Sequence, residues 1–89
     1  MICEEEVKIQ NKLGLHARAA AQFVKTANRY SSEVTVRKEQ LKVNGKSILG
    51  VLTLAAACNS TIQIICEGAD ASEALLALKG LVEDKFQEE

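Results

Sequence analysis

Four short stretches of the chain alternate apolar and polar residues, which is the pattern of a β-strand with one buried face. These stretches are residues 7–10, 33–37, 40–43 and 61–67. The charged pair Lys38 and Glu39 separates the second stretch from the third and predicts a hairpin. In the fourth stretch Ile62, Ile64 and Cys66 share a face, which makes it the clearest strand in the sequence.

Three other segments space their apolar residues as the buried face of a helix does. The first begins at Ala17, and its expected stripe consists of Ala17, Ala20, Ala21, Val24 and Ala27, with Phe23 beside it. The second is a short helix after Ser47, which stands at an N-cap position, and Gly50 interrupts its apolar run. The third follows Asp70, which forms a capping-box pattern with Glu73, and its stripe consists of Ala71, Leu75, Leu78 and Val82.

The predicted elements follow the order strand, helix, strand, strand, helix, strand, helix. This mixed order with one tight hairpin predicts an α+β fold, in which helices cover one face of a mostly antiparallel sheet. At 89 residues the chain is long enough for one hydrophobic core, so we expect a single domain spanning residues 1–89.

Composition and charge narrow the classes of function. The chain has 11 basic and 12 acidic residues and a net charge of −1, so the basic surface of a nucleic-acid-binding domain is absent. Residues 47–66 carry no charge over a length that would cross a bilayer. Because Asn59, Ser60 and Thr61 divide them, we interpret them as two buried elements joined by a turn. Three glutamates at positions 4–6 are unlike a signal peptide, so we expect a cytoplasmic protein without a membrane partner.

The three cysteines, Cys3, Cys58 and Cys66, lack the paired spacing of metal ligands, and the only histidine is far from them in sequence. We therefore expect reduced thiols, no metal and no cofactor. A metal- or thiol-based function that uses these cysteines is kept as one hypothesis to be tested.

The only histidine, His16, stands where the first predicted helix begins, within the segment Gly14-Leu15-His16-Ala17-Arg18. A helix start offers unpaired amide groups and the positive end of the helix dipole, which attract an anion such as phosphate. The dipole also disfavours the protonated imidazole, and a neutral imidazole is a nucleophile. Arg18 would add charge-assisted hydrogen bonds. This arrangement favours a phosphohistidine, although a surface histidine that only caps the helix also fits.

Ser47 has two interpretations. It caps the short helix, or it is a regulatory phosphorylation site beside an exposed apolar patch of Leu49 and Leu52, where a phosphate would add roughly two negative charges. Gly45, Lys46 and Ser47 also resemble the end of a nucleotide-binding P-loop. That motif needs an earlier glycine where this chain has Gln40, so we exclude nucleotide binding here.

Three segments resemble the HPr family, the histidine-containing phosphocarriers of the bacterial phosphoenolpyruvate-dependent sugar phosphotransferase system. Residues 11–18, Asn-Lys-Leu-Gly-Leu-His-Ala-Arg, followed by an alanine-rich helix, resemble its active-site segment. Residues 46–52, Lys-Ser-Ile-Leu-Gly-Val-Leu, resemble its regulatory-serine segment, and residues 67–71 resemble the opening of its last helix. The segments occur in the family's order, and the resemblance covers nearly the whole chain.

The resemblance implies an open-faced β-sandwich: a four-stranded antiparallel sheet with three helices on one face. It implies that Nδ1 of His16 accepts a phosphoryl group from phosphorylated enzyme I and passes it to sugar-specific IIA domains. The Arg18 side chain and the amides of Ala17 and Arg18 would hold this group, and Ser47 would be the target of HPr kinase/phosphorylase. The implied docking residues are Ala17, Ala21, Lys25, Lys46, Ile48, Leu49 and Leu52.

One residue departs from the family's pattern. Ala19 stands where the family usually has proline, and alanine keeps the helix without fixing φ in its first turn. We expect the chemistry to persist, with partner choice and transfer rate affected. The leading hypothesis is a monomeric phosphoryl carrier rather than a stand-alone enzyme. The alternative is a diverged regulatory binding module, either nitrogen-related or acting through phosphorylated Ser47.

Overall fold

A computed structural model describes residues 1–88 of the chain. The elements are β1 (Ile2–Lys8), α1 (Ala17–Ala27), β2 (Glu33–Lys38), β3 (Leu41–Asn44), α2 (Ile48–Thr53), β4 (Thr61–Glu67), α3 (Ala71–Glu83) and a final 3-10 helix, η1 (Lys85–Gln87). The order predicted from the sequence is therefore confirmed for the four strands and three α-helices. The hairpin between β2 and β3 turns at Glu39, whose φ is +56°.

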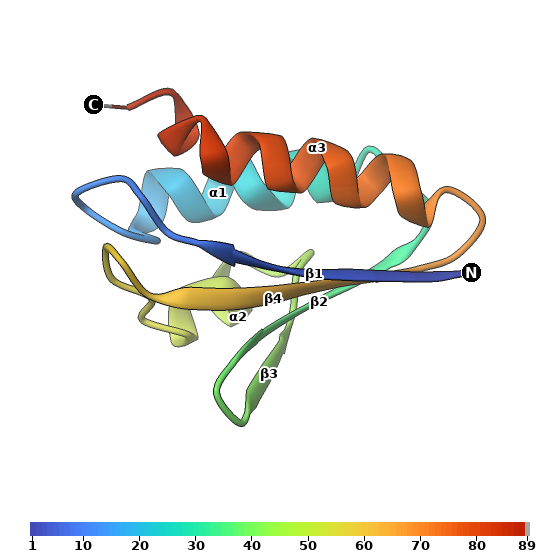
Figure 1. Ribbon diagram of the computed structural model, residues 1–89, viewed down its shortest axis with the longest axis horizontal. Helices are drawn as coiled ribbons and strands as arrows, with labels where there is room; N and C mark the ends of the chain where they lie inside the picture. The colour runs from blue at the N-terminus through green and yellow to red at the C-terminus, as the bar shows by residue number, and fades with distance from the viewer. Residues whose placement is uncertain (89) are drawn as a thin grey trace.

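The four strands form one antiparallel sheet in the order β1-β4-β2-β3 (Figure 1). β4 is paired on both sides, so that Cys66 lies opposite Cys3 of β1 and opposite Val34 of β2. Its predicted inward face is confirmed, since Ile62, Ile64 and Cys66 are all buried. The open α+β architecture matches the expected fold class.

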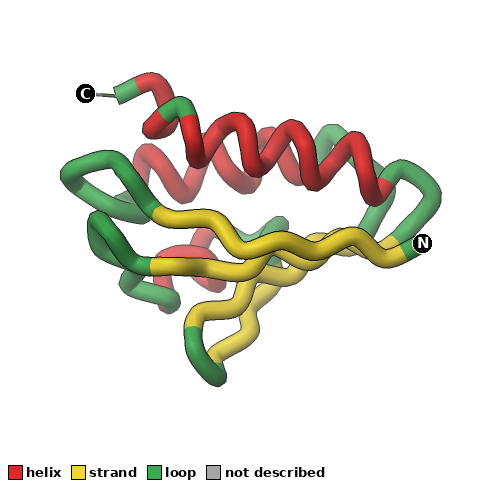
Figure 2. The backbone as a smooth tube through the Cα atoms, in the orientation of Figure 1, coloured by secondary structure: helices red, strands yellow, loops and turns green. Residues whose placement is uncertain are grey.

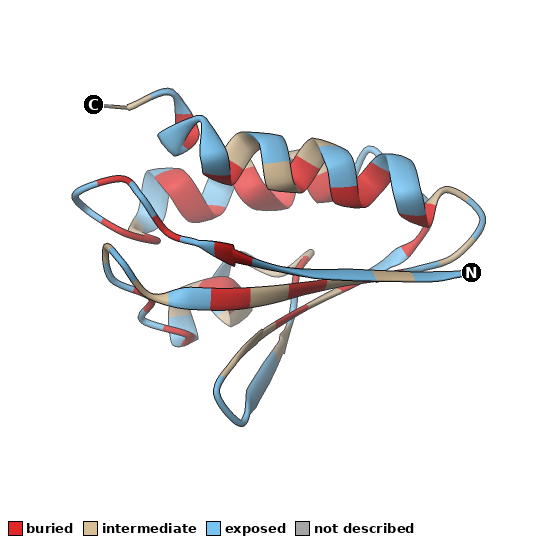
Figure 3. Ribbon diagram, viewed as in Figure 1, coloured by how far each residue is buried: buried red, intermediate tan, exposed pale blue. Residues whose placement is uncertain are grey.

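Helices α1 and α3 run side by side over one face of the sheet (Figures 1 and 2). α2 packs against α1 and lies next to β3. All three helices contribute to one core, in which the side facing the sheet is buried and the outer side is exposed (Figure 3). The stripe predicted for α3 is confirmed, because Ala71, Leu75, Leu78 and Val82 are buried.

The first strand was predicted wrongly at both ends. The sequence pattern placed it at residues 7–10, whereas β1 runs from Ile2 to Lys8. Its first half lacks apolar alternation because this edge strand is held by partners on neighbouring elements. Glu4 accepts a hydrogen bond from Gln63 of β4 at 2.6 Å, and Glu5 forms an ion pair with Lys79 of α3.

The stripe predicted for the first helix was rotated from the observed one. The buried residues of α1 are Ala19, Ala20, Phe23, Val24 and Ala27, whereas Ala17 and Ala21 are exposed. Alanine occurs on both the buried and the exposed face of a helix, so the apolar spacing alone did not fix which face of α1 is buried. Ala17 and Ala21 are thus left on a surface that a partner can reach.

The uncharged residues 47–66 form two separate elements, as predicted. α2 ends at Thr53 and β4 begins at Thr61, and the connection contains Asn59 with a φ of +75°. Within residues 1–88, no helix has the length and apolar character needed to cross a bilayer.

The capping box predicted at the start of α3 is absent. The Asp70 carboxylate makes no hydrogen bond to its own helix and instead accepts from the amides of Ser31 and Ser32, both at 2.9 Å. The Ser32 hydroxyl donates to the same carboxylate. These bonds hold the pKa of Asp70 at about 2, below its ordinary value, with the Ser32 hydroxyl as the largest cause. Asp70 therefore ties the α1–β2 loop to α3.

Candidate functional site

The loop that joins β1 to α1 is held in one conformation by its own hydrogen bonds. The Gly14 amide donates to the Asn11 carbonyl at 3.1 Å, and the Asn11 side-chain amide donates back to the Gly14 carbonyl at 2.8 Å. Gly14 has a φ of +67°, and a Cβ there would lie 2.5 Å from the Ala56 carbonyl oxygen. Glycine is therefore required, both by its φ and by the close approach of the α2–β4 connection (Figure 2).

His16 is the N-cap of α1. Its backbone is extended, and its Nδ1 accepts a hydrogen bond from the Arg18 amide at 3.3 Å. Because Nδ1 is an acceptor here, the neutral ring carries its proton on Nε2. The side chain is 26% exposed. The Ala17 amide has no acceptor within residues 1–88, so the start of α1 retains a donor for an anion.

The C-terminal segment returns to this loop, a contact that no local sequence pattern indicated (Figure 1). After α3, three residues with positive φ reverse the chain, and Phe86 among them is 1% exposed. Glu88 then lies 2.5 Å from Nε2 of His16 through one carboxylate oxygen, and accepts from the Asn11 side chain at 3.1 Å through the other. Neither Asn11 nor Glu88 was predicted as a site residue.

The electrostatics of Glu88 follow from these neighbours. Burial alone would raise the pKa of this carboxyl, but hydrogen bonds from His16 and Asn11, and the nearby charges of His16 and Arg18, hold it below its ordinary value. The carboxylate is therefore ionised at neutral pH. Its negative charge lies against the His16 ring.

An open hollow of about 500 Å³ adjoins this site. Its lining includes Lys12, Arg18 and Glu88, together with the flanking residues Leu13 and Gln87. Arg18 is exposed and lies in the first turn of α1, two residues after His16. Two cationic side chains line this hollow together with Glu88, which contacts the His16 ring. Such charges suit a small dianion such as a phosphoryl group.

Ser47 is the N-cap of α2, as predicted, and its hydroxyl oxygen accepts from the Gly50 amide at 3.0 Å. The apolar patch beside it differs from the expected one. Ile48 is 43% and Leu49 78% exposed, whereas Leu52 is partly buried against the core. In the six-residue helix α2, Val51 is buried and Leu52 packs against the core. The exposed apolar patch therefore consists of Ile48 and Leu49.

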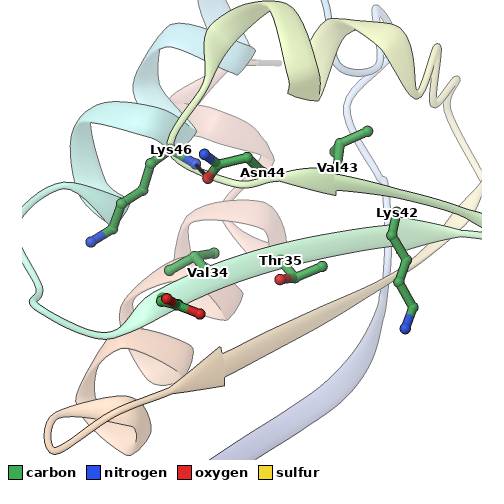
Figure 4. A pocket seen from close by; sticks show the side chains of 7 residues that line it. Val34, Thr35, Lys42, Val43, Asn44 and Lys46 are labelled. Carbon is green, nitrogen blue, oxygen red and sulfur yellow. Dashed lines mark hydrogen bonds between the residues drawn. The ribbon is translucent and has the colours of Figure 1, made fainter.

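Lys46 is engaged with the fold. It lines a hollow of about 460 Å³ beside β2 and β3, which Figure 4 shows with Lys42 at the other side. Its ammonium donates to the Tyr30 carbonyl at 2.7 Å. This hollow does not include His16. The other expected docking residues of α1 (Ala17, Ala21 and Lys25) are exposed and recur every fourth residue, so they share a face of the helix.

The three cysteines are free thiols, and Cys58 donates to the Gln10 carbonyl at 3.7 Å. Cys66 is buried in the core, and burial raises the pKa of its thiol to about 11, so it stays protonated at neutral pH. Residues 1–88 contain no group of three or more potential metal-ligating side chains.

Comparison with known proteins agrees with this geometry. Residues 3–84 match the family described as the PTS HPr component phosphorylation site. The chain belongs to the HPr family. It is 47% identical over 85 residues to the phosphocarrier protein HPr of Neisseria meningitidis, with 96% of each chain covered. A crystal structure of HPr from Thermoanaerobacter tengcongensis superimposes with a TM-score of 0.94 at 46% identity, covering 98% of each chain.

The relatives also include proteins named HPr-like protein Crh. The HPr-like protein Crh of Halalkalibacterium halodurans is 48% identical over 80 residues, which cover 90% of this chain and 95% of the relative. Membership of the family supports a phosphocarrier role in the phosphotransferase system. Identity to HPr and to this Crh protein is of the same order.

Proposed function

We propose that this protein accepts a phosphoryl group on Nδ1 of His16 from phosphorylated enzyme I and passes it to a sugar-specific IIA domain. The supporting observation is the position of the imidazole at the amino end of α1, with Nδ1 facing the Arg18 amide and unprotonated. Arg18 lies in the first turn of the same helix, and its side chain would supply the positive charge that a phosphoryl group needs.

The reaction is an in-line transfer between two nitrogens. The Nδ1 lone pair attacks phosphorus, the bond from phosphorus to the donor's histidine breaks, and its electrons return to the donor's ring. The Arg18 amide leaves its long hydrogen bond with Nδ1 and, with the Ala17 amide, donates to the phosphoryl oxygens. Positioning and electrostatic stabilisation carry most of the catalysis in such transfers.

The partners dock on the exposed face of α1 and on the neighbouring patch of Ile48 and Leu49. Because one surface meets a donor and several acceptors in turn, each interface is small and transient. A monomer leaves this surface open. Lys46 contributes through its backbone and stem rather than its ammonium, which already bonds to Tyr30.

Ser47 is a second site, proposed as the target of HPr kinase/phosphorylase. Its hydroxyl is at the start of α2 and adjoins Leu49, the most exposed apolar residue of the chain's described part. A phosphate there would satisfy the helix amides and place roughly two negative charges at the edge of the docking patch. Replacing Ser47 by Asp should therefore weaken transfer through His16; unchanged binding and transfer would reject the regulatory role.

Incubation with phosphoenolpyruvate and enzyme I tests the carrier function. The wild type should acquire an acid-labile, base-stable phosphoryl group, and His16→Ala should acquire none. Ser47→Ala is the control, because it removes the other proposed phosphorylation site and should be phosphorylated as the wild type is. A full adduct on His16→Ala would reject the proposal.

A further inference from the structure

We propose that Glu88 is a positioning residue for phosphoryl transfer. Its carboxylate holds the His16 ring with the proton on Nε2 and balances the positive charge that the ring gains when Nδ1 binds phosphorus. This role rests on the proposed function of His16 and assigns a task to the C-terminal segment.

The two ring nitrogens have opposite hydrogen-bonding roles. Nδ1 accepts from the Arg18 amide, which requires an unprotonated nitrogen, and Nε2 lies 2.5 Å from the Glu88 carboxylate, which requires a proton on Nε2. The two contacts therefore select the same tautomer, in which the reacting lone pair is on Nδ1. Without the carboxylate, only the 3.3 Å bond from Arg18 would select it.

The carboxylate is itself held in place. Its second oxygen accepts from the side-chain amide of Asn11, which is fully buried and also donates to the Gly14 carbonyl. Phe86, buried two residues earlier, anchors the reversed chain. Glu88 is thus connected to the same loop that positions His16, and its side chain is only 14% exposed.

The charge changes during transfer give the carboxylate its effect. When the Nδ1 lone pair forms the bond to phosphorus, positive charge spreads over the ring to Nε2–H, where Glu88 lies. No proton moves: Nε2 keeps its hydrogen and Glu88 stays ionised. The helix dipole and Arg18 both disfavour a positive ring, so the carboxylate offsets them. When the phosphoryl group leaves, the bonding electrons return to Nδ1 and the charge disappears.

The test compares proteins labelled with 15N in histidine: wild type, Glu88→Gln, Glu88→Ala and Glu83→Gln. The last is the matched control, because it removes one negative charge from an exposed position at the end of α3. Long-range 1H–15N NMR gives the position of the ring proton. Single-turnover reaction with phosphoramidate gives the phosphorylation rate without a partner protein, since the ring nitrogen attacks phosphorus and ammonia leaves.

We expect the proton on Nε2 in the wild type and in Glu83→Gln. Glu88→Ala should show a mixture of tautomers and react about twofold to fivefold more slowly, the range for a partly exposed charge pair. Glu88→Gln should keep the tautomer, because its side-chain oxygen still accepts, but lose part of the rate. A Glu88→Ala protein that keeps either the wild-type tautomer or the wild-type rate would overturn the proposal.

Failure of the carrier function gives a different result. If enzyme I does not phosphorylate the wild type, the proposed function is wrong, whereas the tautomer comparison and the phosphoramidate rates still decide the role of Glu88.

Discussion

The N-cap residues of α1 and α3 use their side chains for different purposes. At α3, the Asp70 carboxylate is bonded to Ser31 and Ser32 of another loop, and its hydrogen-bonding capacity is used within the fold. At α1, the His16 ring makes one long bond to its helix and one to the C-terminal Glu88, and the Ala17 amide remains without an acceptor in residues 1–88. The Asp70 side chain is therefore committed to the fold, whereas Nδ1 of His16 has only the long bond from the Arg18 amide and keeps its lone pair for another partner.

The largest effect is expected at Gly14, which shapes the α1 end. Gly14→Ala would strain a residue at φ +67° and force a Cβ against the Ala56 carbonyl. We expect a loss of about 2 to 4 kcal/mol in the free energy of unfolding, measured by urea denaturation, and slower phosphorylation of His16.

Gly80→Ala is the matched control for this variant. Gly80 lies inside α3, and a Cβ there would meet nothing within 4 Å. Alanine should raise stability by roughly 0.5 to 1 kcal/mol. Equal effects of the two substitutions would contradict the role given to Gly14.

Arg18→Ala should slow phosphoryl transfer at the start of α1 without changing the stability of the fold. Removing charge-assisted hydrogen bonds to a phosphoryl group should slow transfer from phosphorylated enzyme I by about tenfold to a hundredfold. Because Arg18 is exposed, urea denaturation should be almost unchanged. Arg29→Ala, also exposed but distant in sequence from the site, should transfer at the wild-type rate; equal losses in both variants would indicate a general charge effect.

Asp70→Asn should affect the α3 end alone. The pKa of Asp70 is about 2 in the folded protein and about 3.8 when unperturbed, so the ionised carboxylate adds stability above pH 3.8 that is lost as pH falls toward 2. The wild type should lose stability over this interval more steeply than Asp70→Asn, measured by urea midpoints against pH. Phosphorylation of His16 at neutral pH should be unchanged.

An exposed acidic residue provides the comparison for Asp70. Asp84→Asn at the end of α3 should follow the wild-type acid profile. If Asp70→Asn also follows it, the bonds to Ser31 and Ser32 do not stabilise the fold.

The smallest effect is expected for Ala19→Pro, which restores the residue that the family usually has. Ala19 is in the first turn of α1, where the backbone amide has no helical partner to lose. Because proline reduces the conformational freedom of the unfolded chain, it should raise the free energy of unfolding by about 0.5 kcal/mol. A loss of more than that amount, seen in thermal denaturation, would show that the buried site lacks room for the ring.

Local pattern was sufficient for most of the fold. β4 and α3 were predicted with their buried faces, because alternation and helical spacing act over a few residues, and Ser47 was placed correctly as a cap. β1 was predicted poorly because its acidic half is stabilised by partners in β4 and α3, which no local pattern contains.

In the candidate site, too, residues in a local motif were predicted and residues joined by long-range contacts were missed. His16 and Arg18 follow from a short motif at a helix start. The structure places Arg18 in the lining of a hollow and His16 at the N-cap, next to the Ala17 amide that has no acceptor within residues 1–88. Glu88 and Asn11 were missed because their contact joins the two ends of the chain, 77 residues apart, through a reversal that depends on burial of Phe86. The capping box at Asp70 failed because tertiary partners took its carboxylate.

The position of the phosphoryl group on the ring is the most direct test of the role proposed for His16. Wild-type protein labelled with 15N in histidine and phosphorylated by phosphoenolpyruvate and enzyme I would be examined by 31P and 15N NMR. We predict a phosphoryl group on Nδ1 of His16, with a proton on Nε2 facing Glu88. A phosphoryl group on Nε2, or on any residue other than His16, would contradict this mechanism.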